Sequence, residues 1–378
     1  MEYKRCTSCV LDNTDSEISF DKDGVCNYCH KMDFVIARYE KRISNAEEHI
    51  KRIISEVKGS GKAKYDCVIG VSGGVDSTYL AYLVKEQFGL TPLAIHLDNG
   101  WNSKLATKNI EQIIRKLGID LYTHVIDWEE FKDLQRSYLL ASVIDIEVLT
   151  DHAIMAILYE QAAKNGIKYI LLGNNESTEG IMPKSWTFTK NDLKNLEDIH
   201  NKYGTKPIKT FPTLGFLKLW QYEHFNGIKL LNPLNYMKYD KKEAMELIVN
   251  KLGWKPYGNK HYESIFTRFY QGYILPKKFN VDKRKPHFSA LIKTDQMSRE
   301  DALEQLKLDP SQEETIQNDY SYVIKKLDFT QEEFDKLISE KPISHFTFDT
   351  DIRSKINKKY LSHNSYFRKI YRLLRRSF

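Results

Sequence analysis

The chain has 378 residues, of which 41% are hydrophobic and 29% are charged, and its formal net charge is +6 at pH 7. No apolar run approaches the ~20 residues that a membrane-spanning helix needs, and the charged first residues do not resemble a secretory signal. We therefore expect a cytoplasmic protein with no integral membrane contact. The mild basic excess suits nucleotide ligands as well as RNA, so charge alone does not separate these two classes.

Four of the five cysteines fall within the first 30 residues, as two Cys-x-x-Cys pairs. Each pair forms a tight knuckle that turns two thiolates toward one point, and two knuckles can surround an ion tetrahedrally. The spacing predicts a zinc ribbon over residues 1–33, with Cys6, Cys9, Cys26 and Cys29 as ligands of Zn²⁺. Two disulfides or an iron–sulfur cluster are the alternatives, and a reducing cytosol disfavours disulfides.

A charged helix is expected over residues 34–58, so that 34–64 form a helical linker. Strands and helices then alternate. We predict strands over 65–71, 92–97, 121–125 and 169–172, and helices over 77–88, 103–117, 151–165 and 239–252. This alternation predicts an α/β fold, a Rossmann-like, doubly wound parallel sheet over 65–255, with ligands at the carboxyl ends of its strands. Residues 232–234 fit one further strand end.

The most specific motif is Ser-Gly-Gly-Val-Asp-Ser at residues 72–77, directly after the first strand. Consecutive glycines let the backbone adopt positive φ and approach a ligand closely, and the following helix N-terminus offers unpaired N–H groups. Phosphate is the expected ligand. Ser72 and Ser77 would donate hydroxyl hydrogen bonds, and Asp76 would orient the loop or reach a Mg²⁺ ion. The loop has no lysine and is therefore not a Walker A motif.

Polar residues also follow the other strands, and we expect them at the same rim. The predicted nucleotide-binding set is Val71, Ser72, Gly73, Gly74, Val75, Asp76, Ser77, His96, Leu97, Asn99, Gly173, Asn174 and Glu179. Magnesium bridging ATP phosphates needs one or two carboxylates. The candidates are Asp76, Glu176 and Glu179 in that order, with Asp145, Glu147 and Asp151 as weaker ones.

The region beyond the sheet reads as helical over 256–345. Ser298-x-x-Asp301 and Thr330-x-x-Glu333 predict helix starts, the second with a capping box. Cations and aromatics interleave over 260–289, as expected for a carboxylated or phosphorylated sugar ligand or for a solvated basic helix with an aromatic core face. The substrate-binding candidates are Lys260, His261, Glu263, Arg268, Lys283, Arg284 and His287. Residues 346–378 form a basic tail. Its end, 366–378, is expected to be an amphipathic helix that packs on the domain or docks a partner, with an anionic membrane surface as the less favoured alternative.

The 72–77 loop resembles the pyrophosphate loop of ATP pyrophosphatases, the PP-loop enzymes. Together with the cysteine pairs, Leu97-Asp98-Asn99-Gly100-Trp101-Asn102, Gly173-Asn174-Asn175-Glu176 and the 260–289 stretch, it makes roughly the first 310 residues similar to the N-acetyl sugar amidotransferase family of lipopolysaccharide and flagellin glycan synthesis. This family includes the pseudaminic acid and O-antigen amidotransferases.

The resemblance implies an enzyme that uses ATP and Mg²⁺ to adenylate a sugar N-acetyl group and replaces its oxygen with ammonia. It implies Ser72, Asp76, Ser77 and Glu176 as catalytic residues. The expected substrate is a diacetamido sugar or a nucleotide sugar, and the expected partner is a glutaminase subunit, because no cysteine is placed as a glutaminase nucleophile. No nucleic-acid partner is expected.

Two other functions remain open. A tRNA-modifying PP-loop enzyme, either a thiolase or a lysidine-type ligase, also combines such a loop with a zinc module. A persulfide-type thiolase needs a pair of free cysteines near ATP, and Cys67, inside the first strand, does not supply one. A non-catalytic nucleotide-binding module is the third possible function. An assay of AMP release would distinguish it from the two enzymes.

Overall fold

A five-stranded sheet lies at the centre of the computed structural model, which describes residues 2–60, 64–257, 262–310 and 313–351. All strand pairs are parallel and the order is β3-β2-β1-β4-β5. The strands are β1 (Cys67–Gly70), β2 (Pro92–Asp98), β3 (Asp120–Val125), β4 (Tyr169–Leu171) and β5 (Lys229–Leu231). Chain order reverses between β1 and β4, so the predicted doubly wound sheet is confirmed.

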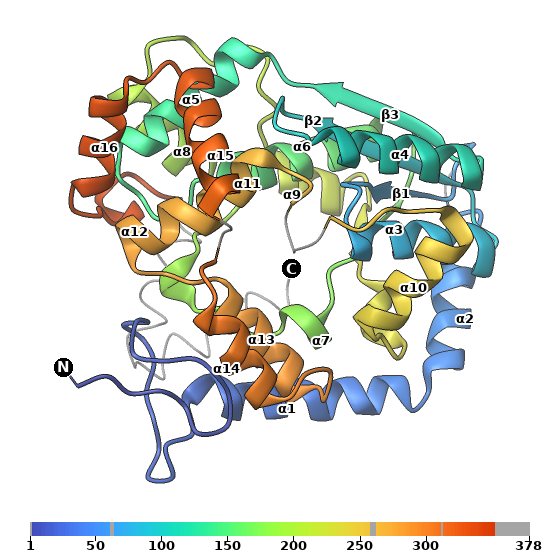
Figure 1. The fold of residues 1–378 in the computed structure, drawn as a ribbon. Coiled ribbons are helices and arrows are strands. Elements are labelled where there is room, and N and C mark those ends of the chain that lie inside the picture. Colours follow the sequence, from blue (N-terminus) through green and yellow to red (C-terminus); the bar gives the residue numbers. More distant parts are fainter. Residues whose placement is uncertain (1, 61–63, 258–261, 311–312, 352–378) are drawn as a thin grey trace.

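Helices cover both faces of the sheet because alternate strand residues point to opposite sides. Ile69 and Ala94 pack in one core under α3 (Val75–Tyr82), α4 (Lys104–Leu117) and α10 (Lys241–Leu252) (Figure 1). Val68 and Ile95 pack in the other, under α6 (Val148–Lys164) and α9 (Phe216–His224). A π-helix, η1 (Leu83–Gln87), continues α3.

A helical layer beside the sheet forms a third core around Phe269 and Tyr270. It contains α5 (Trp128–Leu140), α8 (Leu193–Tyr203), α11 (Ile265–Phe269), the π-helix η4 (Tyr270–Ile274), α12 (Leu275–Phe279), α15 (Glu313–Lys326) and α16 (Gln331–Ser339). The predicted helical C-terminal region is therefore confirmed. Helices α5 and α8 come from within the predicted sheet domain, and the sequence pattern did not reveal them.

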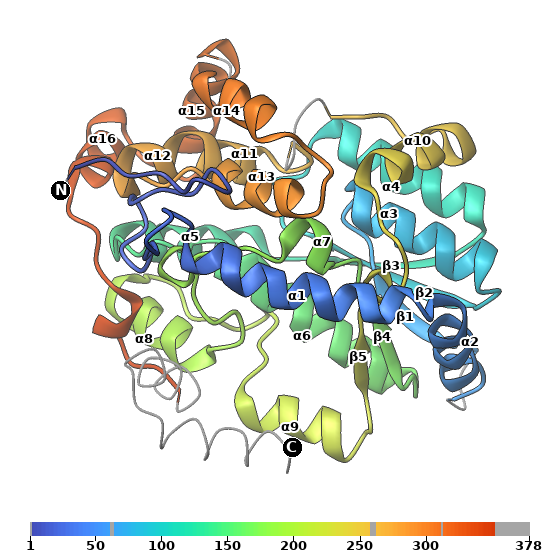
Figure 2. The same cartoon turned by 90° about the horizontal axis from the view of Figure 1, so that it is seen from below.

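The N-terminal module packs against the rest of the molecule. Helix α1 (Asn27–Ile43) starts among the cysteines and lies along α13 (Arg284–Lys293) and α7 (Glu176–Glu179), while α14 (Arg299–Lys307) borders α13 (Figure 2). The single helix predicted over 34–58 is wrong, since the chain breaks at Ser44 and Asn45 before α2 (Ala46–Val57). The predicted boundary at residue 33 falls inside α1.

The remaining elements are short 3₁₀ turns, namely η2 (Lys184–Trp186), η3 (Pro233–Tyr236) and η5 (His345–Thr347). Both predicted helix starts are confirmed, since the side chain of Ser298 caps α14 and Thr330 forms a capping box with Glu333. Lys260, His261 and the predicted tail helix lie outside the described residues. Within the described ranges, no helix combines the length and apolarity needed to span a membrane.

Candidate active site at the phosphate loop

The 72–77 loop leaves β1 at the centre of the sheet and enters α3. Gly73 has φ of +82°, a conformation that strongly favours glycine. The expected positive φ does not extend to Gly74, whose φ of −71° and ψ of 168° place it in extended backbone as the N-cap of α3. Gly74 has no side chain to cap the helix, so the first N–H groups of α3 remain available at the mouth of the loop.

The two predicted hydroxyl donors meet across the loop. Ser72 Oγ lies 3.1 Å from Ser77 Oγ, and Ser77 Oγ donates to the carbonyl of Gly74 at 3.2 Å. The Gly74 N–H donates to Ser72 Oγ at 3.3 Å. Both hydroxyls therefore lie at one point beside the helix N-terminus, where hydroxyl and amide groups can bind a phosphate oxygen together.

Two aromatic side chains hold the loop from outside, and the sequence reading missed both. Trp254 Nε1 and the Tyr257 hydroxyl donate to the Gly73 carbonyl at 2.8 Å and 2.9 Å. Burial raises the pKa of Tyr257 to about 12, which keeps the hydroxyl protonated as a donor. A Cβ atom at Gly73 would lie only 3.0 Å from the Tyr257 hydroxyl and 3.2 Å from Ile110 Cγ1.

The segment after β4 meets the phosphate loop at the reversal of strand order. A Cβ atom at Gly173 would lie 2.8 Å from the backbone oxygen of Asp76, so only glycine fits there. Asp76 accepts a hydrogen bond from the Tyr239 hydroxyl. Glu179 Oε2 accepts from the Asn174 amide at 3.4 Å, and its charge contributes to the raised pKa of Tyr239, whose largest cause is burial. The predicted rim residues after β1 and β4 thus lie together.

Glu176 follows β4, as predicted, and its carboxylate is engaged in ion pairs. Its carboxylate pairs with two guanidinium groups of α1, Arg38 at 2.8 Å and Arg42. Only 25% of its side chain is exposed. These ion pairs explain its position without a metal ion and do not favour the predicted catalytic role.

The end of β2 supplies the third part of the rim. His96 Nδ1 lies 2.9 Å from the carbonyl of Val71, and its Nε2 lies 3.1 Å from the Asn102 amide nitrogen. This pattern requires a hydrogen on Nδ1 only, and burial lowers the pKa of His96, so the ring is neutral. Asn99 donates to Thr150 Oγ1 at 3.2 Å, at the start of α6. Leu97 packs between two apolar cores.

The C-terminal helical region reaches this rim through Glu263. The Ser103 N–H donates to the Glu263 carbonyl at 2.8 Å, and Ile265 N–H donates to the Trp101 carbonyl at 2.9 Å. These bonds direct the Glu263 carboxylate toward the loop, where one oxygen lies 3.8 Å from the position of a Cβ atom at Gly74. Of the substrate-binding candidates that the structure describes, Glu263 is therefore the one shown beside the phosphate loop.

Three other substrate-binding candidates are engaged in internal contacts. Arg268 makes a bidentate pair with Asp319 at 2.6 Å and 2.7 Å. Arg284 pairs with Asp282 at 2.7 Å and also donates to two backbone carbonyls near the end of α14. His287 Nδ1 lies 3.0 Å from the Thr178 carbonyl. These contacts join neighbouring segments of the protein. They explain the positions of three side chains that the sequence analysis predicted to bind a ligand.

A lysine–carboxylate cluster lies next to Asn99 and Thr150, and we define it as Asp145, Glu147, Asp151, Lys190 and Lys283. Lys190 Nζ lies 2.8 Å from Asp145 and 3.1 Å from Asp151, and Lys283 Nζ lies 3.1 Å from Glu147. Burial opposes ionisation of Asp145, but the two ammonium groups lower its pKa overall. The weaker magnesium candidates are thus paired with lysines, and the role of Lys190 was not foreseen.

The four N-terminal cysteines form a buried cage. Their Sγ atoms all lie within 4.8 Å of one another, with 3.8 Å between Cys6 and Cys29 and between Cys9 and Cys26. Thiolates at about 2.3 Å from a tetrahedral ion would be about 3.8 Å apart. The arrangement therefore fits a single ion, whereas the corners of a four-iron cluster would hold the thiolates farther apart. All five cysteines are free thiols, so the disulfide alternative is not seen.

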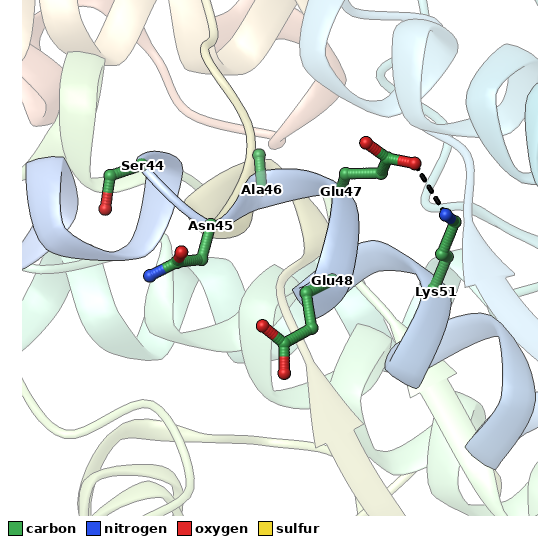
Figure 3. A pocket seen from close by; sticks show the side chains of 6 residues that line it. All are labelled: Ser44, Asn45, Ala46, Glu47, Glu48 and Lys51. Carbon is green, nitrogen blue, oxygen red and sulfur yellow. Dashed lines mark hydrogen bonds and ion pairs between the residues drawn. The ribbon is translucent and has the colours of Figure 1, made fainter.

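A surface hollow where α1 meets α2 is lined by Ser44, Asn45, Ala46, Glu47, Glu48 and Lys51 (Figure 3). Its one ion pair joins Glu47 and Lys51 at 2.5 Å, and both side chains are more than 70% exposed. No predicted site residue lines this hollow, so we assign no function to it.

Comparisons with protein families give two matches. Residues 45–188 match the NAD synthase family, and residues 263–361 match the family described as LPS biosynthesis protein WbpG-like, C-terminal domain. The first match contains the phosphate loop and the second begins at Glu263.

Individual relatives are more distant. An uncharacterised protein of Methanocaldococcus jannaschii is 24% identical over 80% of this chain and 93% of its own length. A tRNA-specific 2-thiouridylase of Fusobacterium nucleatum is 28% identical over 57% of this chain, which spans 63% of that protein. A GMP synthase of Pyrobaculum aerophilum is 33% identical over 20% of this chain, which spans 15% of that enzyme.

Among solved structures, the U34-tRNA thiolase of Methanococcus maripaludis with its [4Fe-4S] cluster is 15% identical, with a TM-score of 0.33 over 81% of this chain and 89% of that one. The NH3-dependent NAD synthetase of Campylobacter jejuni is 15% identical, with a TM-score of 0.30 over 56% and 83%. The phosphate loop and the first family match thus make residues 45–188 similar to ATP-using PP-loop enzymes, and residues 263–361 are similar to the WbpG-like family.

Proposed function

We propose that this protein is an ATP-dependent, AMP-forming amidotransferase that converts a sugar N-acetyl group into an acetamidino group during synthesis of a surface glycan. The observation that carries the proposal is the position of Glu263. The first residue of the WbpG-like region lies beside Gly74 of the phosphate loop, so the nucleotide loop and the region matched to lipopolysaccharide synthesis contribute to one site.

The proposed chemistry follows from the poor leaving ability of an amide oxygen. The acetamide oxygen attacks the α-phosphorus of ATP, an O–P bond forms, and pyrophosphate leaves. Ammonia then adds to the activated carbon, loses protons, and displaces AMP with the original oxygen. Most of the enzyme's contribution is positioning and charge stabilisation.

The residues around the phosphate loop have separate parts in this proposal. The first N–H groups of α3 and the hydroxyls of Ser72 and Ser77 bind the leaving pyrophosphate. Carboxylates of Asp76, Glu179 and Glu263 would hold Mg²⁺, which would neutralise phosphate charge when bound. Neutral His96 keeps its position through Val71 and carries no charge into the site.

The sugar is assigned to the lysine–carboxylate cluster. The cluster adjoins the rim through the contact of Asn99 with Thr150, and Gln271 of the WbpG-like region donates to Glu147 at 3.1 Å. Lysines, carboxylates and an amide at one place suit the hydroxyl, amide and acidic groups of a diacetamido sugar or nucleotide sugar. A π-helix carries Gln271 into this cluster, and π-helices are frequent at functional sites.

Ammonia is proposed to come from a separate glutaminase subunit. Cys67 is buried inside β1 and burial raises its pKa, so it is not a nucleophile. The other four cysteines form the N-terminal cage, which we assign to structural Zn²⁺ because all four positions are thiolates. A cage that needs reduced thiols also suits the cytoplasmic location that we propose.

A tRNA-modifying enzyme is the second candidate, favoured by the similarity to the tRNA-specific 2-thiouridylase. A persulfide mechanism requires two accessible cysteines near ATP, and the structure places all five cysteines in buried positions, four of them in the cage. The lysidine-type reaction requires no cysteine, so it must be tested separately.

The decisive experiment supplies the purified protein with ATP, Mg²⁺ and ammonium, together with free and nucleotide-activated diacetamido sugars. We expect AMP and pyrophosphate, and a sugar product in which NH replaces an amide oxygen by mass spectrometry. ADP as the product would overturn the loop assignment. Turnover with tRNA and none with any sugar would establish the second candidate instead.

A further inference from the structure

Asp76 of the phosphate loop depends on a residue far along the chain for its orientation. Tyr239, just before α10, donates its hydroxyl hydrogen to Asp76 Oδ1. Its side chain is 3% exposed and its ring packs against Tyr79, with 5.7 Å between centroids. Burial, followed by the charge of Asp76, raises the pKa of Tyr239, so its hydroxyl remains a donor at neutral pH.

Helix α1 fixes the segment that carries Tyr239. The hydroxyl of Tyr39 donates to the Met237 carbonyl at 2.8 Å and accepts from the Tyr239 N–H at 3.0 Å. Both bonds end on one oxygen, so that single hydroxyl holds the backbone on either side of residue 238. A shift of α1 would therefore displace Tyr239 and, with it, the hydrogen bond to Asp76.

The same helix holds the other segment that flanks the loop. Arg42 pairs with Glu176 after β4, and its guanidinium lies 5.5 Å from the centre of the Tyr236 ring after β5. The N–H of Glu176 donates to Asn235 Oδ1 at 2.8 Å, which joins the two segments directly. Helix α1 thus contacts both connections next to the strand-order reversal, where ligands bind in sheets of this kind.

We propose that Tyr239 is a positioning residue for Asp76 and that Tyr39 sets the place of Tyr239, so that the N-terminal module helps to shape the ATP site. The inference rests on the proposed function, in which Asp76 holds Mg²⁺. A hydrogen bond to one carboxylate oxygen limits rotation of the Asp76 side chain, so that the carboxylate would be held in one orientation when Mg²⁺ binds. The N-terminal module then acts on nucleotide binding as well as on folding.

The test measures ATP binding to the full-length protein by calorimetry at a series of Mg²⁺ concentrations. The variants are Tyr239→Phe and Tyr39→Phe, with Tyr79→Phe as the matched control. Tyr79 packs on the same ring, and its hydroxyl has no hydrogen-bond partner in the part of the chain that the structure describes. We expect Tyr239→Phe to raise the Mg²⁺ concentration for half-maximal binding about tenfold, Tyr39→Phe to raise it less, and Tyr79→Phe to leave it unchanged.

A double-mutant cycle separates positioning from a general loss of structure. If Tyr239 acts through Asp76, then adding Tyr239→Phe to Asp76→Asn produces no further change in Mg²⁺ dependence. Additive effects in this cycle, or equal values for Tyr239→Phe and Tyr79→Phe, would overturn the inference while leaving the proposed function intact. A wild-type protein that binds no ATP at any Mg²⁺ concentration would instead contradict the proposed function itself.

Discussion

The carboxylate of Glu263 lies 3.8 Å from the point where a Cβ atom would stand at Gly74, so a negative charge faces the N-terminus of α3. A triphosphate bound at the same place would repel this carboxylate at short range. A divalent cation between the two removes that conflict, because carboxylate and phosphate oxygens are both ligands for Mg²⁺. We therefore expect Glu263, the first residue of the WbpG-like region, to make ATP binding depend on Mg²⁺.

Replacement of Glu263 by Gln tests this relationship. We expect the variant to bind metal-free ATP more tightly than the wild type, because the repulsion is gone, and to bind ATP with Mg²⁺ less tightly, because a ligand is lost. Calorimetric titrations with ATP in EDTA and in Mg²⁺ measure both changes. Glu111→Gln, on the exposed face of α4, is the control of equal charge change. Weaker binding in both buffers would show that Glu263 contacts ATP without a metal.

A second prediction concerns the positive φ at Gly73. Alanine there costs about 1–2 kcal/mol of backbone strain and also meets the Tyr257 hydroxyl and Ile110. Gly118, the C-cap of α4, has φ of +58° and nothing within 4 Å of a Cβ atom, so Gly118→Ala has the strain alone. Urea unfolding should show a loss of stability in both variants, and the loss should be larger in Gly73→Ala because of these added contacts. ATP affinity should fall more than tenfold only in Gly73→Ala, and equal affinities would contradict a role for the loop backbone.

Much of the sheet was predictable because its signals are local. The run that includes Val68 and Ile69 is apolar on both faces, and the glycines after it permit a turn that few other residues allow. Strand positions and the reversal of order next to the loop follow from that alternation. The capping box at Thr330 was predictable for the same reason, since both partners lie within one turn.

The missed residues act over long sequence separations. Tyr239 meets Asp76, and Trp254 meets Gly73, only because α10 packs on α3, and no local pattern encodes that pairing. Arg268 was assigned to substrate because its aspartate partner stands 51 positions away. The sequence therefore identifies groups that can bind an anion, while the fold decides which cations are already neutralised.

A third prediction concerns the metal content and stability of the protein when the cysteine cage is disrupted. We expect about one zinc ion per chain by elemental analysis, a lower melting temperature in Cys29→Ser, and loss of the metal in that variant. Cys67→Ser, also a buried thiol but located in β1, should keep the metal. Because α1 begins at the cage and reaches Tyr39, Cys29→Ser should also weaken ATP binding. Iron with inorganic sulfide in the purified protein would contradict the zinc assignment.

The last prediction concerns the pH dependence of stability through His345. This buried histidine accepts a hydrogen bond from the Asp145 N–H at 3.3 Å and lies 2.9 Å from Asn195 Oδ1. Burial lowers its pKa to about 4 from the ordinary value of 6.5. The unfolded chain therefore binds a proton first as the pH falls, so stability from this group is complete above pH 6.5 and declines toward pH 4.

His345→Gln removes this titration, so its unfolding free energy should fall less between pH 7 and pH 4.5 than that of the wild type, by a few kcal/mol. Urea denaturation at several pH values measures the two slopes. His152, whose pKa burial also lowers to about 4, titrates in both proteins and cancels in the comparison. Equal pH dependence of the unfolding free energy in the wild type and His345→Gln would show that folding does not lower the pKa of His345.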